Sequence, residues 1–258
     1  MKYNPYSVSK FGSFDSCNKK FKLHYIDKVK VDSKPQLALF RGSYAHECLE
    51  HSFKYDISFK TNEVFTEEEK QKVQVILENF RNSALGMKIE KLINHPDSVK
   101  EQDFAFNNKL ELVGFWDKSA WLRGSADLYN IKLSQPIIID YKTGKDKSND
   151  EDFGYEQGMM YALYMFIKFP ELTNIKAVFV FVEHSTKKEI FYSREEFNSY
   201  IKLFYDKTKT LEETEIFKEN VSALCNYCDY NNTEFCSSYI ENEEKSNSIM
   251  KSKISLDF

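Results

Sequence analysis

The sequence predicts an α/β fold in which a mainly helical N-terminal region is followed by a sheet. Apolar residues recur at roughly helical spacing through most of the first hundred residues. From Glu101 the pattern changes to short segments that are alternating or wholly apolar, as strands are. Helix and strand patterns then alternate up to about residue 211. The expected order is helices, a meander of strands, a helix, a strand hairpin and a last helix, and we find no internal repeat.

Three helices are expected in the N-terminal region. The first covers residues 9–27, where aromatic side chains follow helical spacing. The second begins just after Gly42 and continues through Phe53. The third opens at Thr66 with a pattern resembling a capping box and reaches about residue 82. The first hundred residues should therefore be mainly helical.

The middle of the chain is expected to form the sheet. The predicted strands there are residues 103–106, 110–115, 121–131 and 136–142. The later elements are a helix over 151–169, strands over 175–184 and 189–192, and a helix over 194–211.

Length and composition limit the class of protein. At 258 residues with 41% hydrophobic and 29% charged positions, the chain can bury one substantial core. The net charge of -4 and the pI near 5.8 argue against coating of nucleic acid by bulk charge, so any DNA binding must use a local basic groove. No apolar run approaches the roughly 18–20 residues of a membrane span, and the first residues contain no signal-peptide pattern. We therefore expect a cytoplasmic protein without membrane contact.

A carboxylate and an ammonium group are expected to share one face at the end of an apolar strand. The strand segment 136–142 ends in Asp140-Tyr-Lys142, and alternation sends Asp140 and Lys142 to one face and Tyr141 to the other. The preceding segment contains Asp127 and, if the two strands are neighbours, this second carboxylate converges on the first. Two carboxylates with little to neutralise them form a site for a hard divalent cation such as Mg²⁺ or Mn²⁺.

Such a site has the chemistry of phosphodiester hydrolysis. The cation would bind a phosphate oxygen, lower the pKa of a bound water and offset charge in the transition state. Lys142 beside it would orient or help to deprotonate the attacking water. An isolated Asp-x-Lys pattern is short and common, and on its own it is more typical of an exposed ion pair. The motifs around it favour the catalytic interpretation.

Five motifs occur in order along nearly the whole chain. They are a Ser-rich segment over residues 7–21 that contains Cys17, Gly42-x-x-x-His46, Gly124-x-x-Asp127, Asp140-Tyr-Lys-Thr-Gly144 and Gln157-x-x-x-Tyr161. In order, residue type and spacing they resemble the RecB-like exonuclease branch of the PD-(D/E)XK nuclease superfamily. The resemblance implies a restriction-endonuclease-like core, with a central mixed sheet flanked by helices.

The resemblance also implies roles for the motif residues. The implied metal ligands are His46, Asp127, Asp140 and the main-chain carbonyl of Tyr141, and the implied catalytic lysine is Lys142. Gln157 and Tyr161 lie on one helix face, where they would contact DNA or brace the catalytic strand. A lone His on an amphipathic helix is more often a packing or surface residue, so His46 depends on its motif. Glu101 is at a position where the family often has an acidic residue, and we leave it outside the ligand set.

The cysteines indicate a second metal site. The chain has five: Cys17, Cys48, Cys225, Cys228 and Cys236. In a cytosolic protein, a Cys-x-x-Cys pair followed by a third Cys indicates metal ligation more than disulfides. The fourth ligand would have to come from a distant part of the chain, and Cys17 is the candidate. Cys48, next to the His46 motif, is more typical of a buried apolar position.

This arrangement of one cysteine plus three resembles the iron-sulfur members of the same branch. These are the AddB-type nuclease domain and the CRISPR-adaptation exonucleases, in which a [4Fe-4S] cluster ties the two chain ends together. Four thiolates suit a structural Zn²⁺ ion as well, and free thiols are the third interpretation. This chain departs from the pattern where Asn18 replaces the Pro after the first Cys, and where the gap between Cys228 and Cys236 is longer than the common spacing. We favour the cluster and expect its role to be structural.

The expected activity is hydrolysis of DNA phosphodiester bonds with Mg²⁺ or Mn²⁺. The resemblance points to an exonuclease that acts on single strands or duplex ends in recombination, repair or viral DNA processing. The alternatives are a catalytically silent DNA-binding subunit and a structure-selective endonuclease. A helicase partner would have to supply unwound DNA, because the chain has no Gly-x-x-x-x-Gly-Lys-Ser/Thr motif. Residues 253–258 look somewhat like segments that bind sliding clamps, although an ordinary frayed terminus is the commoner case.

We expect one nuclease domain over residues 1–240. Its parts are a mainly helical elaboration over 1–100, the catalytic core over 101–212 and a Cys-rich segment over 213–240 that closes on Cys17. Residues 241–258 are polar and expected to be a disordered tail.

Overall fold

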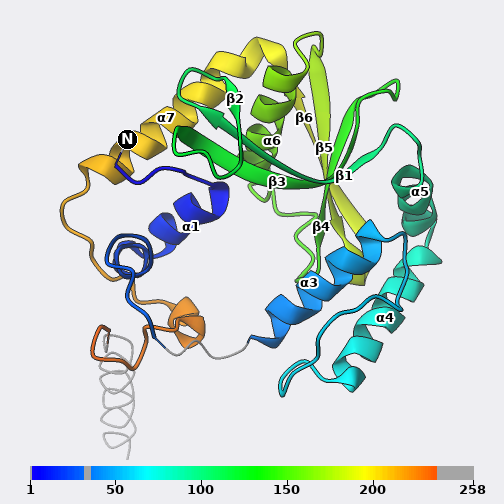
Figure 1. Cartoon of the computed structure of the whole chain (residues 1–258), viewed down its shortest axis with the longest axis horizontal. Helices are drawn as coiled ribbons and strands as arrows, with labels where there is room; N and C mark the ends of the chain where they lie inside the picture. The colour runs from blue at the N-terminus through cyan, green and yellow to red at the C-terminus, as the bar shows by residue number, and fades with distance from the viewer. Residues whose placement is uncertain (1, 32–35, 237–258) are drawn as a thin grey trace, which may run out of the picture. The chain divides into compact units, whose positions relative to one another are not determined.

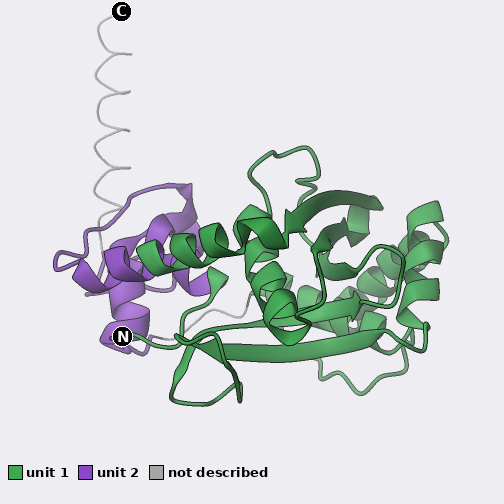
Figure 2. Ribbon diagram, turned by 90° about the horizontal axis from the view of Figure 1, so that it is seen from above, with its two compact units in different colours: residues 1, 3–8, 35–206 green, residues 2, 9–34, 207–258 purple. Residues whose placement is uncertain are grey.

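The computed structural model describes residues 2–31 and 36–236, and its chain divides into two compact units (Figure 2). Of the described residues, the first unit comprises 3–8 and 36–206, and the second comprises 2, 9–31 and 207–236. The helices are α1 (Val8–Ser16), α2 (Asn18–Phe21), α3 (Leu37–Glu50), α4 (Glu67–Arg81), α5 (Ala84–Ile93), α6 (Tyr155–Lys168) and α7 (Phe197–Glu213). The strands are β1 (Val99–Asn107), β2 (Leu112–Val113), β3 (Ala120–Asn130), β4 (Ile137–Lys142), β5 (Asn174–Phe181) and β6 (Thr186–Ser193).

The first unit is built on a six-stranded mixed sheet with the strand order β2-β1-β3-β4-β5-β6 (Figure 1). Neighbouring strands are antiparallel except for β4 and β5, which are parallel. Parallel neighbours need a crossover connection, and α6 supplies it. The prediction of an α/β fold with a mixed sheet and a helical N-terminal region is confirmed.

Helices cover both faces of β4. Helices α3, α4 and α5 share a buried core with one face of the sheet, and that core includes Tyr44, Leu77, Ile89, Leu128, Ile139 and Tyr141. The other face of β4 meets α6, where the Tyr161 hydroxyl contacts Asp140. The alternation predicted for this strand is therefore present, with Asp140 on one side and Tyr141 on the other.

The first predicted helix is interrupted at Cys17. The backbone of Cys17 is extended, with φ -164° and ψ 109°, and its sulfur accepts the N–H of Lys20 as the N-cap of α2. A π-helical turn, Lys22–Ile26, then follows α2. Helix α3 also begins earlier than predicted, at Leu37. Helical spacing alone could not locate the break, because apolar residues continue on both sides of it.

The remaining N-terminal helices differ in how well the sequence marked them. Helix α4 agrees with the prediction, and the Thr66 hydroxyl oxygen accepts the N–H of Glu69 at 3.3 Å. Helix α5 was not predicted. Its cap, Ser83, accepts the N–H of Gly86 at 3.0 Å, one residue after α4 has ended at its own cap, Asn82. Two helices separated by so short a connection resemble a single helical pattern with a frayed end.

The strands agree with the prediction in order and differ at their ends. Strand β1 is longer than predicted and β2 is much shorter. Strand β5 ends at Phe181, where a 3₁₀ turn, Val182–His184, replaces the predicted end of the strand. Strand β6 extends beyond the predicted segment on both sides because it pairs with the whole length of β5.

The second unit packs residues from both ends of the described chain around aromatic side chains. The Phe14 and Phe21 ring centroids lie 5.4 Å apart, and the Phe217 ring is stacked on Phe21 at 6.3 Å. The Tyr230 hydroxyl donates to the carbonyl of Val29 at 3.2 Å. Each aromatic pair contributes about 0.5–1.5 kcal/mol beyond area burial. Residues of the N-terminal helices and the C-terminal segment therefore share one core within this unit.

Some expectations lie beyond these observations. The predicted tail over residues 241–258, with its docking segment, lies outside the described residues. One nuclease domain over residues 1–240 stays a prediction, because a division into compact units does not decide how the chain folds. The helices of the described residues include none with the length and apolar character needed to cross a membrane.

Replacing Gly158 by Ala should destabilise the protein. A Cβ at Gly158 in α6 would lie 2.2 Å from the hydroxyl oxygen of Tyr192. Tyr192 is 1% exposed and its hydroxyl donates to the carbonyl of Tyr155 at 2.8 Å, so the ring has no space to move into. Overpacking of this kind costs about 1–3 kcal/mol. Urea or thermal unfolding should show a lower midpoint for Gly158→Ala.

Gly12→Ala in α1 is the matched control. Nothing lies within 4 Å of the position that its Cβ would take. Alanine favours a helix interior over glycine by about 0.5–1 kcal/mol, so this variant should unfold at an unchanged or higher midpoint. A Gly158→Ala protein as stable as the wild type would contradict the close packing of α6 against Tyr192.

Candidate active site

Two carboxylates lie where β3 and β4 stop pairing. The two strands pair only through residues 128–130 and 137–139, with Leu128 opposite Ile139. Asp127 and Asp140 come directly beyond this paired segment. The Asp127 carboxylate accepts the N–H of Tyr141 at 2.6 Å, so a side chain takes the place of a ladder hydrogen bond. Asp127 is 9% exposed and Asp140 is 5% exposed, so both carboxylates are buried.

Helix α3 brings His46 to these carboxylates. Gly42 and His46 are one helical turn apart, and a Cβ on Gly42 would lie 3.2 Å from the hydroxyl oxygen of Thr143. Glycine therefore allows the helix to approach the segment that follows β4. The His46 Nδ1 lies 3.4 Å from Asp127 Oδ1, and its Nε2 lies 3.0 Å from the carbonyl oxygen of Tyr141. The Gly-x-x-x-His and Asp-Tyr-Lys-Thr-Gly motifs thus meet.

Glu101 of β1 joins this group. The ligand atoms of His46, Glu101 and Asp127 all lie within 4.8 Å of one another. Glu101 has φ 44°, a left-handed conformation that is uncommon for residues other than glycine. Only its position before the sheet hinted at a role in the sequence. Its unusual backbone could not be read from residue types, which is why it was left out of the predicted ligand set.

Asp140 is held by three donors. Tyr161 donates its hydroxyl to Asp140 Oδ1 at 2.5 Å, and Gln157 donates its amide Nε2 to the same oxygen at 2.6 Å. The Lys142 ammonium lies 2.7 Å from Asp140 Oδ2. Gln157 also accepts a hydrogen bond from Lys142 at 2.9 Å and donates to the Tyr161 hydroxyl oxygen at 2.7 Å. The four side chains form a closed hydrogen-bonded network between β4 and α6.

This network favours one of the two roles left open for Gln157 and Tyr161. Tyr161 is 3% exposed, and its hydroxyl is directed to Asp140 and Gln157. A side chain buried in this way braces β4 through Asp140. Contact between Tyr161 and DNA, the other expected role, would require the network to open.

The charges around His46 favour its protonated form. Burial lowers the pKa of His46, but the hydrogen bond and the negative charge of Asp127, with the charges of Asp140 and Glu101, raise it to about 9. An imidazolium donates from both nitrogens, which matches its contacts with Asp127 and with the Tyr141 carbonyl.

The pKa values of Glu101 and Asp140 are raised as well. Desolvation and the charge of Asp127 raise the pKa of Glu101 to about 7, although the side chain as a whole is exposed. Burial raises the pKa of Asp140, and the charge of Lys142 opposes that effect. Crowded acidic groups with raised pKa values are typical of a place where a cation is bound.

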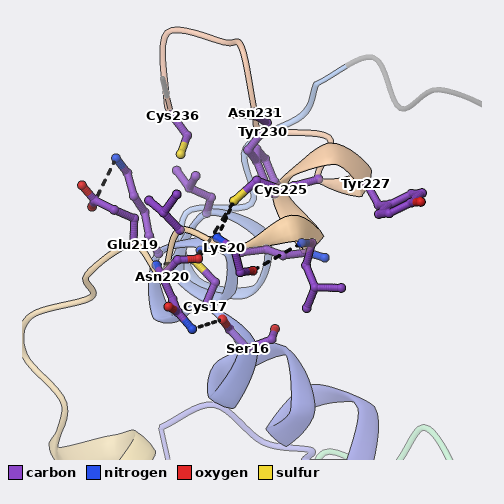
Figure 3. Close-up of a pocket in the computed structure, with 16 residues that line it drawn as sticks. Ser16, Cys17, Lys20, Glu219, Asn220, Cys225, Tyr227, Tyr230, Asn231 and Cys236 are labelled. Atoms are coloured by element: carbon purple, nitrogen blue, oxygen red, sulfur yellow. Dashed lines mark hydrogen bonds and ion pairs between the residues drawn. The ribbon is translucent and has the colours of Figure 1, made fainter. Parts of the chain in front are cut away.

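Four cysteines line a cavity within the second unit (Figure 3). Cys17, Cys225, Cys228 and Cys236 surround a volume of about 130 Å³. The sulfurs of Cys17, Cys225 and Cys236 face the same space in Figure 3. All four thiols are free and partly exposed. The cysteines predicted from spacing to act together are therefore brought to one cavity.

Main-chain N–H groups donate hydrogen bonds to two of these sulfurs. Cys17 Sγ accepts from Lys20 at 3.5 Å and from Asn220 at 3.4 Å. Cys225 Sγ accepts from Ser222 at 3.5 Å. Hydrogen bonds of this kind stabilise thiolates and tune metal centres. Cys48, by contrast, is 0% exposed in the core of the first unit, as its sequence context predicted.

The chain belongs to the PD-(D/E)XK nuclease superfamily, whose family model matches residues 5–233. A solved structure from Eubacterium rectale, of a protein named "Putative exonuclease", has a TM-score of 0.56 and 16% identity over 90% of this chain and 89% of that one. This likeness shows the fold. A second structure, of SSO0001, has 12% identity over 89% of this chain and 85% of that one, but its TM-score of 0.37 supports no argument. Comparison with curated proteins found no match.

Nucleases of this superfamily usually use a divalent metal ion, and the residues present fit one. The donors are carboxylate oxygens, a carbonyl oxygen and an imidazole, which suit Mg²⁺ or Mn²⁺. The buried Asp140 Oδ2 has no hydrogen-bond partner of normal geometry, although the Lys142 ammonium lies close to it. His46 and the Tyr141 carbonyl, whose Nε2 and oxygen lie 3.0 Å apart, would be two of the metal ion's ligands.

Binding of Mn²⁺ should strengthen as the pH rises through about 7 and toward about 9, the pKa values of Glu101 and His46 in the metal-free protein. Metal ligands must be deprotonated, so below these values protons compete with the cation. Isothermal titration calorimetry in two buffers of different ionisation heat would measure both the affinity and the protons released. An affinity that does not change with pH would contradict this picture.

Glu101→Gln separates the two contributions. This variant should bind Mn²⁺ more weakly and lose the part of the pH dependence near 7, while the part assigned to His46 remains. Glu63→Gln, at an exposed glutamate outside the site, should match the wild type.

Proposed function

We propose that this protein is a Mg²⁺- or Mn²⁺-dependent DNA exonuclease of the RecB-like branch. The observation that carries the proposal is that a His46–Asp127 contact and an Asp140–Lys142 contact both lie at the divergence of β3 and β4, where the main-chain N–H of Tyr141 donates to Asp127. These groups come from α3, β3 and β4, and the two carboxylates are buried, which is costly for charged groups.

The proposed ligands are His46, Asp127, Asp140 and the carbonyl of Tyr141, with Glu101 as an addition from the structure. A divalent cation bound there would polarise a phosphate oxygen and lower the pKa of a water molecule. The remaining steps fall to side chains of the chain itself.

Lys142 is placed to act on the nucleophile and on the phosphate. Its ammonium has an acceptor in Asp140 and another in Gln157. An ammonium group has three donors, and among the described residues Lys142 makes no further hydrogen bond. Its side chain is 27% exposed, so the third donor can orient an attacking water or hold a phosphate oxygen.

Gln157 and Tyr161 are proposed as positioning residues. They hold one oxygen of Asp140 and leave the other toward Lys142. Loss of Gln157 would release both the Asp140 carboxylate and the Lys142 ammonium, because Gln157 contacts both, whereas loss of Tyr161 would remove a donor from Asp140 alone.

The exonuclease assignment has two rivals. The name of the Eubacterium rectale neighbour supports an exonuclease. A silent DNA-binding subunit would have no need to keep a lysine and two carboxylates in one network. A structure-selective endonuclease would use the same site and would differ in cutting DNA that has no ends. We place the activity in recombination, repair or viral DNA processing, with a helicase or a sliding clamp as candidate partners.

Lys142→Ala and Asp127→Asn should each lower the rate of DNA cleavage by about a hundredfold to a thousandfold or more, the loss typical when a charge-stabilising group is removed. End-labelled single-stranded and duplex DNA, with Mg²⁺, Mn²⁺ or EDTA, would show the rate, the metal requirement and the polarity. Covalently closed circles in a parallel reaction should remain intact.

Lys132→Ala is the control, since Lys132 is an exposed lysine in the turn before β4. It should cleave DNA at the wild-type rate. Cleavage of closed circles would establish an endonuclease. Intact DNA in every reaction, with DNA binding retained, would establish the silent subunit.

We also propose that the four cysteines hold a [4Fe-4S] cluster. The support is their common cavity and the N–H groups directed at Cys17 and Cys225. Four thiolates suit a structural zinc ion as well. The resemblance of the cysteine pattern to the iron-sulfur members of the branch is what favours the cluster.

Protein purified without oxygen should be brown and contain about four iron atoms per chain. Cys17→Ser should lose the iron and lower the stability of the second unit, because Cys17 joins α1 and α2 to the C-terminal segment of that unit. Metal analysis and the visible spectrum measure both effects. A colourless protein with one zinc per chain would exclude the cluster and leave the nuclease proposal standing.

Cys48→Ala is the matched control for the cysteines. It should keep all of the iron, because Cys48 lies in a different core. Loss of iron from this variant as well would mean that the assignment of ligands is wrong.

A further inference from the structure

The loop after β2 displays an aromatic pair with a guanidinium group against it. The Phe115 and Trp116 ring centroids lie 4.9 Å apart, with the rings nearly perpendicular at 89°. The Arg123 guanidinium lies 4.9 Å from each ring centroid. We call Phe115, Trp116 and Arg123 the aromatic platform. All three residues belong to the first unit, in which β2 is an edge strand of the sheet (Figure 1).

Trp116 is unusually exposed. Its side chain is 80% exposed, more than any other large hydrophobic residue of the described chain, whereas the other tryptophan, Trp121, is 2% exposed. Single exposed apolar residues are ordinary on protein surfaces. The difference here is that the ring is held by Arg123 on one side and remains open on the other.

The turn that carries Trp116 is held by its own hydrogen bonds. The N–H of Asp117 donates to the carbonyl of Gly114 at 2.9 Å, and the N–H of Ala120 donates to the carbonyl of Asp117 at 3.1 Å. The Asp117 carboxylate accepts the N–H of Ser119 at 2.7 Å. A flexible loop would lose entropy on binding a ligand, and this turn has already been ordered.

The aromatic platform is connected to the proposed active site by one strand. Arg123 and Asp127 are both in β3. Four residues of a strand span about 13 Å, roughly four nucleotides at the ~3.4 Å rise of stacked DNA. One strand of DNA could therefore touch the aromatic platform while a phosphate lies at Asp127.

We propose that the aromatic platform binds an unpaired base of single-stranded DNA whose backbone enters the active site. This rests on the proposed nuclease function and specifies its substrate. Aromatic rings and arginine planes stack on bases of any sequence, which suits a nuclease without sequence preference. A base within a duplex presents only its edge in a groove, so its face cannot stack on Trp116.

The charge of the region fits this ligand. Arg123 and Lys118 are cationic, and the one acid of the turn, Asp117, has its carboxylate engaged by Ser119. Because the chain has a net charge of -4, its overall charge does not attract DNA, and stacking on a base provides a local way to bind it.

The test uses intrinsic fluorescence of the full protein with Lys142→Ala, in EDTA, so that DNA is not cut. Trp116 is the exposed tryptophan and Trp121 the buried one, so quenching by a stacked base reports Trp116. Single-stranded oligothymidine should quench the emission, and a duplex of the same length should not. In the Trp116→Ala background the remaining emission should not respond to DNA.

Affinity is measured separately, by anisotropy of a labelled oligonucleotide. Trp116→Ala should weaken single-strand binding about tenfold or more, and Trp116→Phe should keep most of it because a ring remains. Phe191→Ala is the matched control, since Phe191 is 63% exposed on β6 at the other edge of the sheet, and it should bind as the wild type does.

Equal quenching by duplex, or unchanged affinity of Trp116→Ala, would overturn the proposal while cleavage by the wild type still upheld the nuclease. If the wild type cleaves no DNA in any assay while single strands still quench the emission, the nuclease proposal is wrong. The aromatic platform would then remain as a DNA-binding surface.

Discussion

The candidate active site depends on Tyr141, which joins three parts of the first unit through its N–H, its carbonyl and its ring. Its N–H donates to the Asp127 carboxylate and fixes where β3 and β4 separate. Its carbonyl accepts from His46 and ties α3 to the end of β4. Its ring lies in the core that α3, α4 and α5 share with the sheet. The positions of Asp127 and His46 therefore depend on one residue whose side chain takes no part in the proposed chemistry.

The buried carboxylate of Asp140 depends on hydrogen-bond donors from α6. A buried carboxylate is strongly destabilising unless it is paired or hydrogen-bonded. Asp140 has two hydrogen-bond donors from α6, Gln157 and Tyr161, and an ion pair from its own strand, Lys142. The parallel pairing of β4 with β5 requires a crossover, and the crossover helix supplies those two donors. Fold and site are coupled at this point.

How far the sequence predicts the site depends on the kind of information each residue carries. Asp140 and Lys142 followed from the alternation of a strand, which is a property of local geometry. Asp127 and His46 needed the order of motifs, because their meeting depends on packing between distant elements. Glu101 was noted only for its place before the sheet and was set aside, because its left-handed backbone at φ 44° depends on the surrounding structure.

The same reasoning applies to the fold. The continuous helical pattern through Cys17 concealed a break that the sulfur itself caps. The closely spaced caps between α4 and α5 concealed a helix boundary. Trp116 carried no periodic signal, and its exposure became evident only from the fold. Local patterns thus predicted most of the elements but not α5, whereas breaks, backbone strain and exposure depended on tertiary structure.

The measurement that tests the central claim most directly is pulsed electron paramagnetic resonance of Mn²⁺ bound to the wild type and to His46→Gln. If the site at the divergence of β3 and β4 holds the cation, the wild-type spectrum will contain coupling to an imidazole nitrogen, and His46→Gln will lose it. Bound Mn²⁺ without any nitrogen coupling in the wild type, or the same coupling in both proteins, would contradict the account.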